Sequence, residues 1–299
     1  MHPTGIHHVT GIVRDARANV DFYTDTLGLR FLKRTVNMED RFEYHFHYGD
    51  ATGSAGSAVT FLPFRDEADG RVGQPQISEA ALAVPDGSLD EWEARIAESA
   101  GTVGTRTERF GEPTLTLRDP DGTHLALVET AGHGEPWTET VPESTATRGV
   151  SGVSLLSASP FVTASILETF GFERGGQEDD RVRYETGRGV VDILDREAEF
   201  GREGAGTIHH VAFGVDSEER LHEWREQLAG REDVRASYVK DRHFYHSLYV
   251  RDAGGILFEL ATEPMDMLGD DPAPGDHLYL PEWFEEDREL IESQLPLEP

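Results

Sequence analysis

The chain has 299 residues, and its 57 Asp and Glu against 27 Lys and Arg give a formal net charge of −30. Nucleic-acid binders carry a basic patch, and anionic membranes attract basic segments, so this acidity argues against both partners. No apolar run reaches the roughly 18 to 20 residues that cross a bilayer. The chain has no cysteine, so it has no disulfide and no thiolate ligand. His, Asp and Glu remain as candidate metal ligands.

The basic residues are almost all arginine, since Lys33 and Lys240 are the only lysines. An acidic composition poor in lysine resembles that of proteins from salt-loving organisms, where molar salt shortens the Debye length to about 3 Å. We therefore predict a halophilic protein whose charge serves solvation. The first residues lack the charged and apolar regions of a signal peptide, so we expect a cytoplasmic protein.

The N-terminal part of the chain predicts a β-strand, a helix and three further strands. A strand is expected over residues 5–13, and apolar residues at helical spacing predict a helix over 15–27. Gly28 is placed to end that helix. Three extended stretches follow at 30–37, 42–48 and 58–64. This order defines a βαβββ module.

The same order of elements recurs three more times, which predicts an α+β fold of four βαβββ modules. The second module spans about residues 77–129, the third 150–194 and the fourth 207–261, with its last three strands at 236–239, 247–251 and 256–261. We expect two domains of two modules each, at 1–135 and 145–264. A C-terminal extension at 265–299 ends in an acidic helix over 281–294.

Strand alternation selects candidate site residues in the outer modules. Side chains two residues apart share a face of a strand. His8 and Thr10 then share one face of the first strand, and Val9 lies on the face that a helix must cover. By the same alternation, His210 and Glu259 lie on strand faces opposite bulky apolar residues. The second histidine of each His-His pair is therefore the better ligand candidate.

Several motifs together resemble the vicinal oxygen chelate superfamily of glyoxalases, antibiotic-resistance proteins and extradiol ring-cleaving dioxygenases. The resemblance is closer to the branch that includes (chloro)hydroquinone 1,2-dioxygenases, and it covers nearly the whole chain. It implies that the four modules form two vicinal oxygen chelate domains. The motifs are GIHHVT at 5–10, GTIHHVA at 206–212, DRHFYHSLYVRD at 241–252, GGILFELAT at 254–262 and LPEWF at 280–284.

The resemblance places the metal ligands at His8, His210 and Glu259, the residues that strand alternation also selects. The inner modules lack them, because their matching positions hold the residues Glu79, Ala126 and Gly152. One metal ion per chain follows, most simply with the first and fourth modules facing each other.

Two histidines and one carboxylate form the facial triad of non-haem Fe(II) oxygenases, which leaves open positions for a substrate and O₂. The resemblance therefore implies an Fe(II)-dependent, or Mn(II)-dependent, extradiol-type dioxygenase that opens the ring of a small aromatic diol, a hydroquinone or a catechol. It places Tyr249 and Arg242 at the substrate, with Thr10 beside His8. His7 and His209 match positions that are important in the family, although alternation points them away from the cavity.

Other interpretations stay open from the residues alone. One is a glyoxalase-like isomerase or lyase that uses Zn²⁺, Ni²⁺ or Mn²⁺ with a fourth ligand. Another is a protein that binds an aromatic antibiotic without catalysis. Arg242 also has the simpler role of pairing with surface acids, and the sequence leaves open whether the chain forms a homo-oligomer. Further candidate ligands are the histidines His45, His47, His243 and His246.

Overall fold

The computed structural model describes residues 2–265, 267–269 and 275–296. The first module contains β1 (Ile6–Val13), α1 (Ala16–Asp21), the π-helical turn η1 (Phe22–Thr26), β2 (Arg30–Asn37), β3 (Asp40–Gly49) and β4 (Ala58–Pro63). The second contains β5 (Gln76–Val84), α2 (Leu89–Ala97), β6 (Thr102–Arg109), β7 (Glu112–Arg118) and β8 (His124–Glu129).

The third module contains β9 (Val150–Leu156), α3 (Pro160–Thr169), β10 (Glu173–Glu178), β11 (Arg181–Glu185) and β12 (Val190–Leu194). The fourth contains β13 (Thr207–Val215), α4 (Glu218–Leu228), β14 (Val234–Ala236), β15 (Lys240–Asp241), β16 (His246–Asp252) and β17 (Leu257–Thr262). The 3₁₀-helix η2 (Glu282–Asp287) and α5 (Arg288–Gln294) follow. The α+β fold of four βαβββ modules is confirmed.

The structure corrects three expected elements. The helix expected over 15–27 is α-helical only to Asp21 and continues as a π-helical turn. The acidic helix over 281–294 begins with a 3₁₀ segment. The strand expected over 236–239 is wrong in position, because β14 ends at Ala236 and β15 begins at Lys240. The Tyr249 amide donates to the Ser237 hydroxyl, so a side chain replaces a backbone acceptor where the strand pairing is interrupted.

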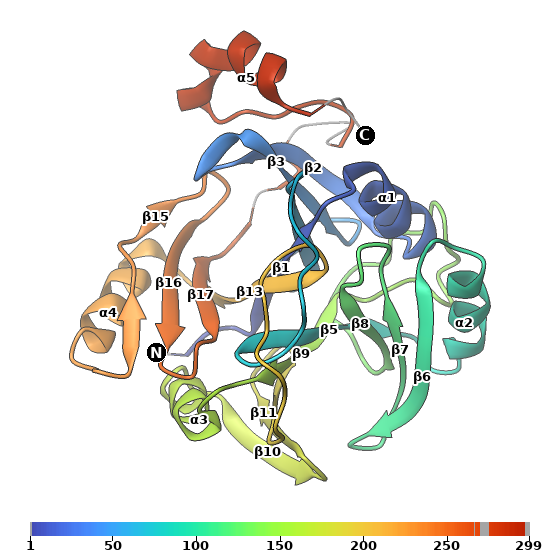
Figure 1. Cartoon of the computed structure of the whole chain (residues 1–299), viewed down its shortest axis with the longest axis vertical. Helices are drawn as coiled ribbons and strands as arrows, with labels where there is room; N and C mark the ends of the chain where they lie inside the picture. The colour runs from blue at the N-terminus through green and yellow to red at the C-terminus, as the bar shows by residue number, and fades with distance from the viewer. Residues whose placement is uncertain (1, 266, 270–274, 297–299) are drawn as a thin grey trace.

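The outer modules share one continuous sheet. β1 pairs with β4 in parallel and with β13 antiparallel, and β13 in turn pairs with β17 in parallel. The inner modules repeat this pattern, with β5 and β9 antiparallel at the centre. A single bridge between Ile208 and Ile77 joins β13 to β5. Strands about 200 residues apart in sequence therefore lie side by side, with helices α1 to α4 at the periphery (Figure 1).

The packing of α4 covers one face of the fourth-module strands and leaves the other face free to form a site. Leu221, Trp224 and Leu228 lie on one face of α4 and are buried. Phe213 and Phe258 are buried in the same core. Because alternate residues point to opposite faces of a strand, neighbours such as Glu259 are turned away from this core. The helix thus covers the apolar face and leaves the polar face as the inner surface.

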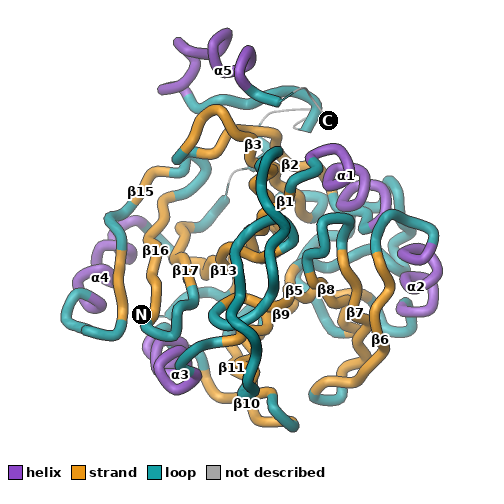
Figure 2. The backbone as a smooth tube through the Cα atoms, viewed as in Figure 1, coloured by secondary structure: helices purple, strands orange, loops and turns teal. Residues whose placement is uncertain are grey.

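The C-terminal extension packs on the first module. Tyr279 N donates to the Arg34 carbonyl at the edge of β2, and Arg41 forms an ion pair of 2.6 Å with Asp287. Figure 2 shows α5 beyond β2 and β3. None of the helices in the described ranges is both long and apolar enough to cross a membrane.

Candidate metal centre

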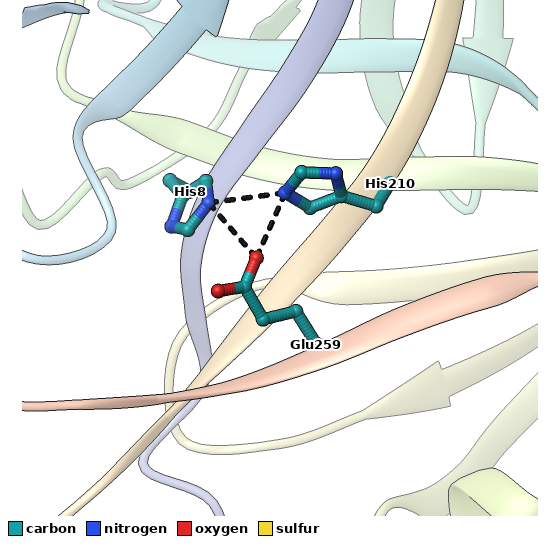
Figure 3. A group of neighbouring side chains, drawn as sticks. All are labelled: His8, His210 and Glu259. Carbon is teal, nitrogen blue, oxygen red and sulfur yellow. Dashed lines mark hydrogen bonds and ion pairs between the residues drawn. The ribbon is translucent and has the colours of Figure 1, made fainter. Parts of the chain in front are cut away.

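Three buried side chains from three adjacent strands converge at the centre of the outer sheet. His8 lies on β1, His210 on β13 and Glu259 on β17 (Figure 3). The Nε2 atoms of the two histidines are 3.3 Å apart. Glu259 Oε2 lies 2.8 Å from His210 Nε2 and 3.4 Å from His8 Nε2. The exposed fraction is 0% for His8 and Glu259 and 5% for His210.

This geometry fits a divalent metal ion. Ligand atoms about 2.1 Å from one ion and at right angles to one another are about 3 Å apart, close to the three observed separations. Glu259 Oε1 is buried, and in the described part of the chain it has no hydrogen-bond partner. A buried carboxylate oxygen without a donor is costly unless it is paired or coordinates a metal. The donor set of two imidazoles and one carboxylate suits iron or manganese.

The electrostatics of His210 and Glu259 favour the states that bind metal. Burial lowers the pKa of His210 to about 4, so the imidazole is neutral at neutral pH. Burial alone would raise the pKa of Glu259, but His8 and His210 outweigh it and hold this pKa well below its usual range. Neutral imidazoles and an ionised carboxylate are the forms that ligate divalent ions.

A cavity of about 440 Å³ opens beside the triad, with His210 in its wall. Its size suits a small aromatic molecule, since ligand pockets run from roughly 300 to 1,000 Å³. Its lining contains both apolar side chains and hydrogen-bonding groups. The apolar lining consists of Ile12, Met38, Leu62, Phe64, Phe244 and Leu257.

Tyr249 and Arg242 both line this cavity, where the resemblance places them. The Tyr249 ring lies edge-on to His210, with 5.5 Å between ring centroids, and the Arg242 guanidinium lies 5.1 Å from the centre of the Tyr249 ring. Burial raises the pKa of Tyr249, so its hydroxyl stays protonated as a donor. Arg242 Nη2 also pairs with Glu39 at 2.9 Å, so the guanidinium bridges the site and the surface turn after β2.

Thr10 also lines the cavity, and its Oγ1 lies 3.0 Å from His210 Nε2. The same hydroxyl lies 2.8 Å from Thr60 Oγ1 on β4, which in turn lies 3.0 Å from His45 Nε2 on β3. Sequence reasoning missed Thr60. Aligning the modules points to Thr60, because it stands in the first module where Glu259 stands in the fourth. Thr10 pairs with Thr60 as Ala212 pairs with Glu259.

His7 and His209 contact the two ligand histidines directly. His7 Nδ1 lies 2.8 Å from His8 Nδ1, and His209 Nδ1 lies 2.7 Å from His210 Nδ1. His209 also lines the cavity, so the expectation that alternation points it away is wrong. The strand is irregular there, because Thr10 pairs with His210 but Gly11 pairs with Ile208. His209 has no opposite residue and forms a β-bulge, which breaks the alternation.

The other candidate histidines separate into two groups. His45 and His47 line the cavity. His243 Nε2 lies 2.6 Å from the Tyr279 hydroxyl in the C-terminal extension, and His246 approaches Glu218 of α4 at 3.7 Å. Within the described ranges, none of these four joins the cluster of close metal-ligand atoms, which comprises His8, His210 and Glu259.

Ion pairs occupy two of the matching positions of the inner modules, whereas Ala126 and Gly152 carry no charge. Glu79 on β5 pairs with Arg109, and Asp192 on β12 lies 2.9 Å from Arg183 and 3.0 Å from Arg181. Each inner carboxylate therefore has a guanidinium partner in place of histidines. This arrangement explains why the described residues form one candidate metal centre and not two.

A four-module fold with a buried His-His-Glu cluster beside a cavity is the architecture of a metal-dependent enzyme of the vicinal oxygen chelate type. Residues 5–127 match the family model described as the Glyoxalase/Bleomycin resistance protein/Dioxygenase superfamily. The chain belongs to this superfamily.

Relatives that share 31–37% identity with the chain are named as dioxygenases. The chain is 37% identical to "Putative ring-cleaving dioxygenase MhqO" of Bacillus subtilis (strain 168), over 97% of this chain and 95% of the relative. It is 31% identical to a chlorohydroquinone/hydroquinone 1,2-dioxygenase of Sphingobium indicum, over 86% and 85% of the two chains. A solved dioxygenase structure from B. subtilis, named there as putative, superposes with a TM-score of 0.93 at 37% identity, covering 99% of this chain and 98% of that one.

Proposed function

We propose that the chain is an Fe(II)-dependent extradiol-type dioxygenase that opens the ring of a hydroquinone or a catechol. The observation that carries this proposal is the arrangement of the donor atoms of His8, His210 and Glu259 beside a cavity of about 440 Å³. The relatives named as ring-cleaving and hydroquinone dioxygenases support the same reaction class.

The bound ion would hold the diol and O₂ side by side and let electrons pass between them. The protein groups bind and orient the substrate. The apolar side chains that line the cavity pack against the substrate ring, and the Thr10 and Tyr249 hydroxyls donate to substrate oxygens. Arg242 stabilises negative charge on the diol, because a guanidinium in a partly buried site acts at low dielectric. The two oxygens of a hydroquinone lie on opposite sides of its ring, so Arg242 and Tyr249 would orient the oxygen that faces away from the metal centre.

A glyoxalase-like isomerase is the second candidate, and the number of ligands argues against it. That reaction type would use a fourth protein ligand, whereas the cluster of close donor atoms in the described ranges has three members. Three ligands leave room for a diol and O₂ together. Mn(II) would fit the same donor set.

The test is O₂ uptake by protein loaded anaerobically with Fe(II), across a panel of hydroquinones and catechols. We expect about one O₂ consumed per ring opened without an external reductant, and both atoms of ¹⁸O₂ in the product. Zn(II)-loaded protein is the control, because zinc has no redox chemistry. Isomerisation of the thiol adduct of methylglyoxal under argon, without O₂ uptake, would establish the glyoxalase alternative instead.

A further inference from the structure

A continuous line of hydrogen-bonding groups runs from the cavity wall to the metal centre. His45 Nε2 lies 3.0 Å from Thr60 Oγ1, Thr60 Oγ1 lies 2.8 Å from Thr10 Oγ1, and Thr10 Oγ1 lies 3.0 Å from His210 Nε2. Three adjacent strands, β3, β4 and β1, supply its members. Thr10 is 0% and Thr60 1% exposed, so both hydroxyls are shielded from the outer solvent.

The direction of these hydrogen bonds depends on what lies beside Thr10. His210 Nε2 uses its lone pair for a metal ion, or its proton for Glu259, so it is a poor acceptor for the Thr10 hydroxyl. An ionised substrate oxygen is a stronger acceptor, because hydrogen bonds to charged groups are about twice as strong as neutral ones. All donors then point one way, from His45 to Thr60, from Thr60 to Thr10, and from Thr10 to the substrate.

We propose that His45 and Thr60 are positioning residues that orient the Thr10 hydroxyl toward the ionised oxygen of a bound diol. The inference rests on the proposed function. Each donor polarises the next in such a chain, which strengthens the last hydrogen bond at low dielectric. Thr10 is the group that touches the substrate, and the other two act through it.

The surroundings of His45 favour this role over that of a charge. Burial lowers the pKa of His45 to about 3, so its ring is neutral at neutral pH and acts as a hydrogen-bonding group. The His47 ring packs on it with 4.0 Å between centroids, which fixes the ring orientation. His47 has no hydrogen-bond partner on either nitrogen among the described residues, so it does not divert His45 from Thr60.

Two measurements test the proposal on the Thr60→Val variant, which keeps the shape of the side chain and removes its hydroxyl. The first is the apparent pKa of nitrohydroquinone bound under argon to Zn(II)-loaded protein, read from the visible absorption of its anion. We expect Thr60→Val to raise this pKa by about 1, a tenfold loss of acidity. The second is kcat/KM with Fe(II) and O₂, which we expect to fall about 10- to 100-fold, the usual cost of losing a supporting partner.

Matched variants separate the chain from simple packing. Thr60→Ser keeps the hydroxyl and should restore both values. Thr35→Val removes a buried hydroxyl that faces His45 across β2 and β3 and lies outside the hydrogen-bonded line, so it should leave both values unchanged. His45→Phe should behave like Thr60→Val.

The inference fails if Thr60→Val matches the wild type in both measurements, or if Thr60→Ser is as impaired as Thr60→Val. A wild-type protein that takes up no O₂ with any diol would overturn the proposed function, and this inference with it. An active wild type with an unaffected Thr60→Val variant would overturn this inference alone.

Discussion

His7 and His209 occupy equivalent β-bulges on two of the three strands that meet at the metal centre. On β1, Ile6 pairs with Phe213 and His8 with Ala212, so His7 is the extra residue. On β13, His209 is extra in the same way, between Ile208 and His210. A β-bulge re-aims a side chain and increases the local twist. Each ligand histidine therefore directly follows a bulged histidine.

The bulges bring the two rings of each pair into contact. A histidine that ligates through Nε2 carries its proton on Nδ1, and a second group usually accepts that proton and fixes the ring. The Nδ1 atoms of His7 and His209 lie 2.8 Å and 2.7 Å from those of His8 and His210. They are in place to be those acceptors, which is a supporting role for both residues.

The first prediction concerns metal content. Purified wild-type protein loaded anaerobically with Fe(II) should hold about one ion per chain, and His210→Ala should hold almost none, because two ligands rarely retain such an ion. Metal analysis after desalting measures this. His222→Ala, on the exposed face of α4, is the matched control and should keep its ion. Equal metal content in His210→Ala and wild type would refute the ligand assignment.

Alternation along single strands was enough to select His8, His210 and Glu259 from the sequence. Those residues lie on regular stretches, each opposite apolar residues that a helix must cover. The same rule misplaced His209, because a bulge depends on the register between β1 and β13. That register pairs residues about 200 positions apart, and no local pattern encodes it.

Thr60 illustrates a second limit of sequence reasoning. A threonine in a strand is common and has no distinct chemistry. Its importance follows from the parallel pairing of β1 with β4, which places it opposite Thr10. The strand predicted over 236–239 is misplaced for a related reason, since the Ser237 side chain accepts a hydrogen bond from a backbone amide. Side-chain contacts of this kind require the tertiary structure.

The second prediction concerns Tyr249→Phe. This change keeps the ring that packs near His210 and removes only the hydroxyl, so metal content should stay at the wild-type level. Turnover should fall on the order of 10²-fold, the cost of losing one donor directed at developing charge. Steady-state O₂ uptake measures it. Tyr238→Phe, at a ring that is 76% exposed, should retain wild-type turnover. If Tyr249→Phe also retains wild-type turnover, the role of Tyr249 is packing alone.

The third prediction concerns the pH dependence of stability. Asp119 is buried, and burial raises its pKa to about 6. Its carboxylate accepts from the Thr123 amide at 2.8 Å and from the Tyr23 hydroxyl at 3.2 Å. A raised pKa means that the folded state holds the proton more tightly than the unfolded state. The contribution of Asp119 to the free energy of unfolding should therefore be most favourable below about pH 4, fall as the pH rises to about 6, and level off above it.

The Asp119→Asn variant isolates this contribution. The difference in unfolding free energy between wild type and variant should change by about 3 kcal/mol across that window, from the pKa shift. Urea unfolding at several pH values measures it. Asp86→Asn, at an exposed position, is the control for removing one surface carboxylate. A constant difference for Asp119→Asn would mean that Asp119 titrates normally.

The last prediction is that folding and activity both require high salt. The net charge of −30 is confined to one compact body, so the carboxylates repel one another across the surface. At about 0.01 M salt the Debye length is near 30 Å and this repulsion spans the molecule, whereas in molar salt it is about 3 Å and reaches only adjacent groups. The native state concentrates the charge and the unfolded chain spreads it, so removing salt should favour unfolding.

Circular dichroism during dialysis from molar to about 0.01 M salt measures this effect, since the native signal should be lost at the low end. Potassium chloride and sodium chloride should preserve the native signal equally if screening of the charge repulsion stabilises the fold. Fe(II) should be left out of the dialysis and added only once the protein is back in high salt. Metal binding to the folded state would otherwise mask the loss of stability. A native spectrum and full activity at about 0.01 M salt, where repulsion is longest in range, would exclude the halophilic interpretation. A basic partner for the acidic surface would then be the better explanation.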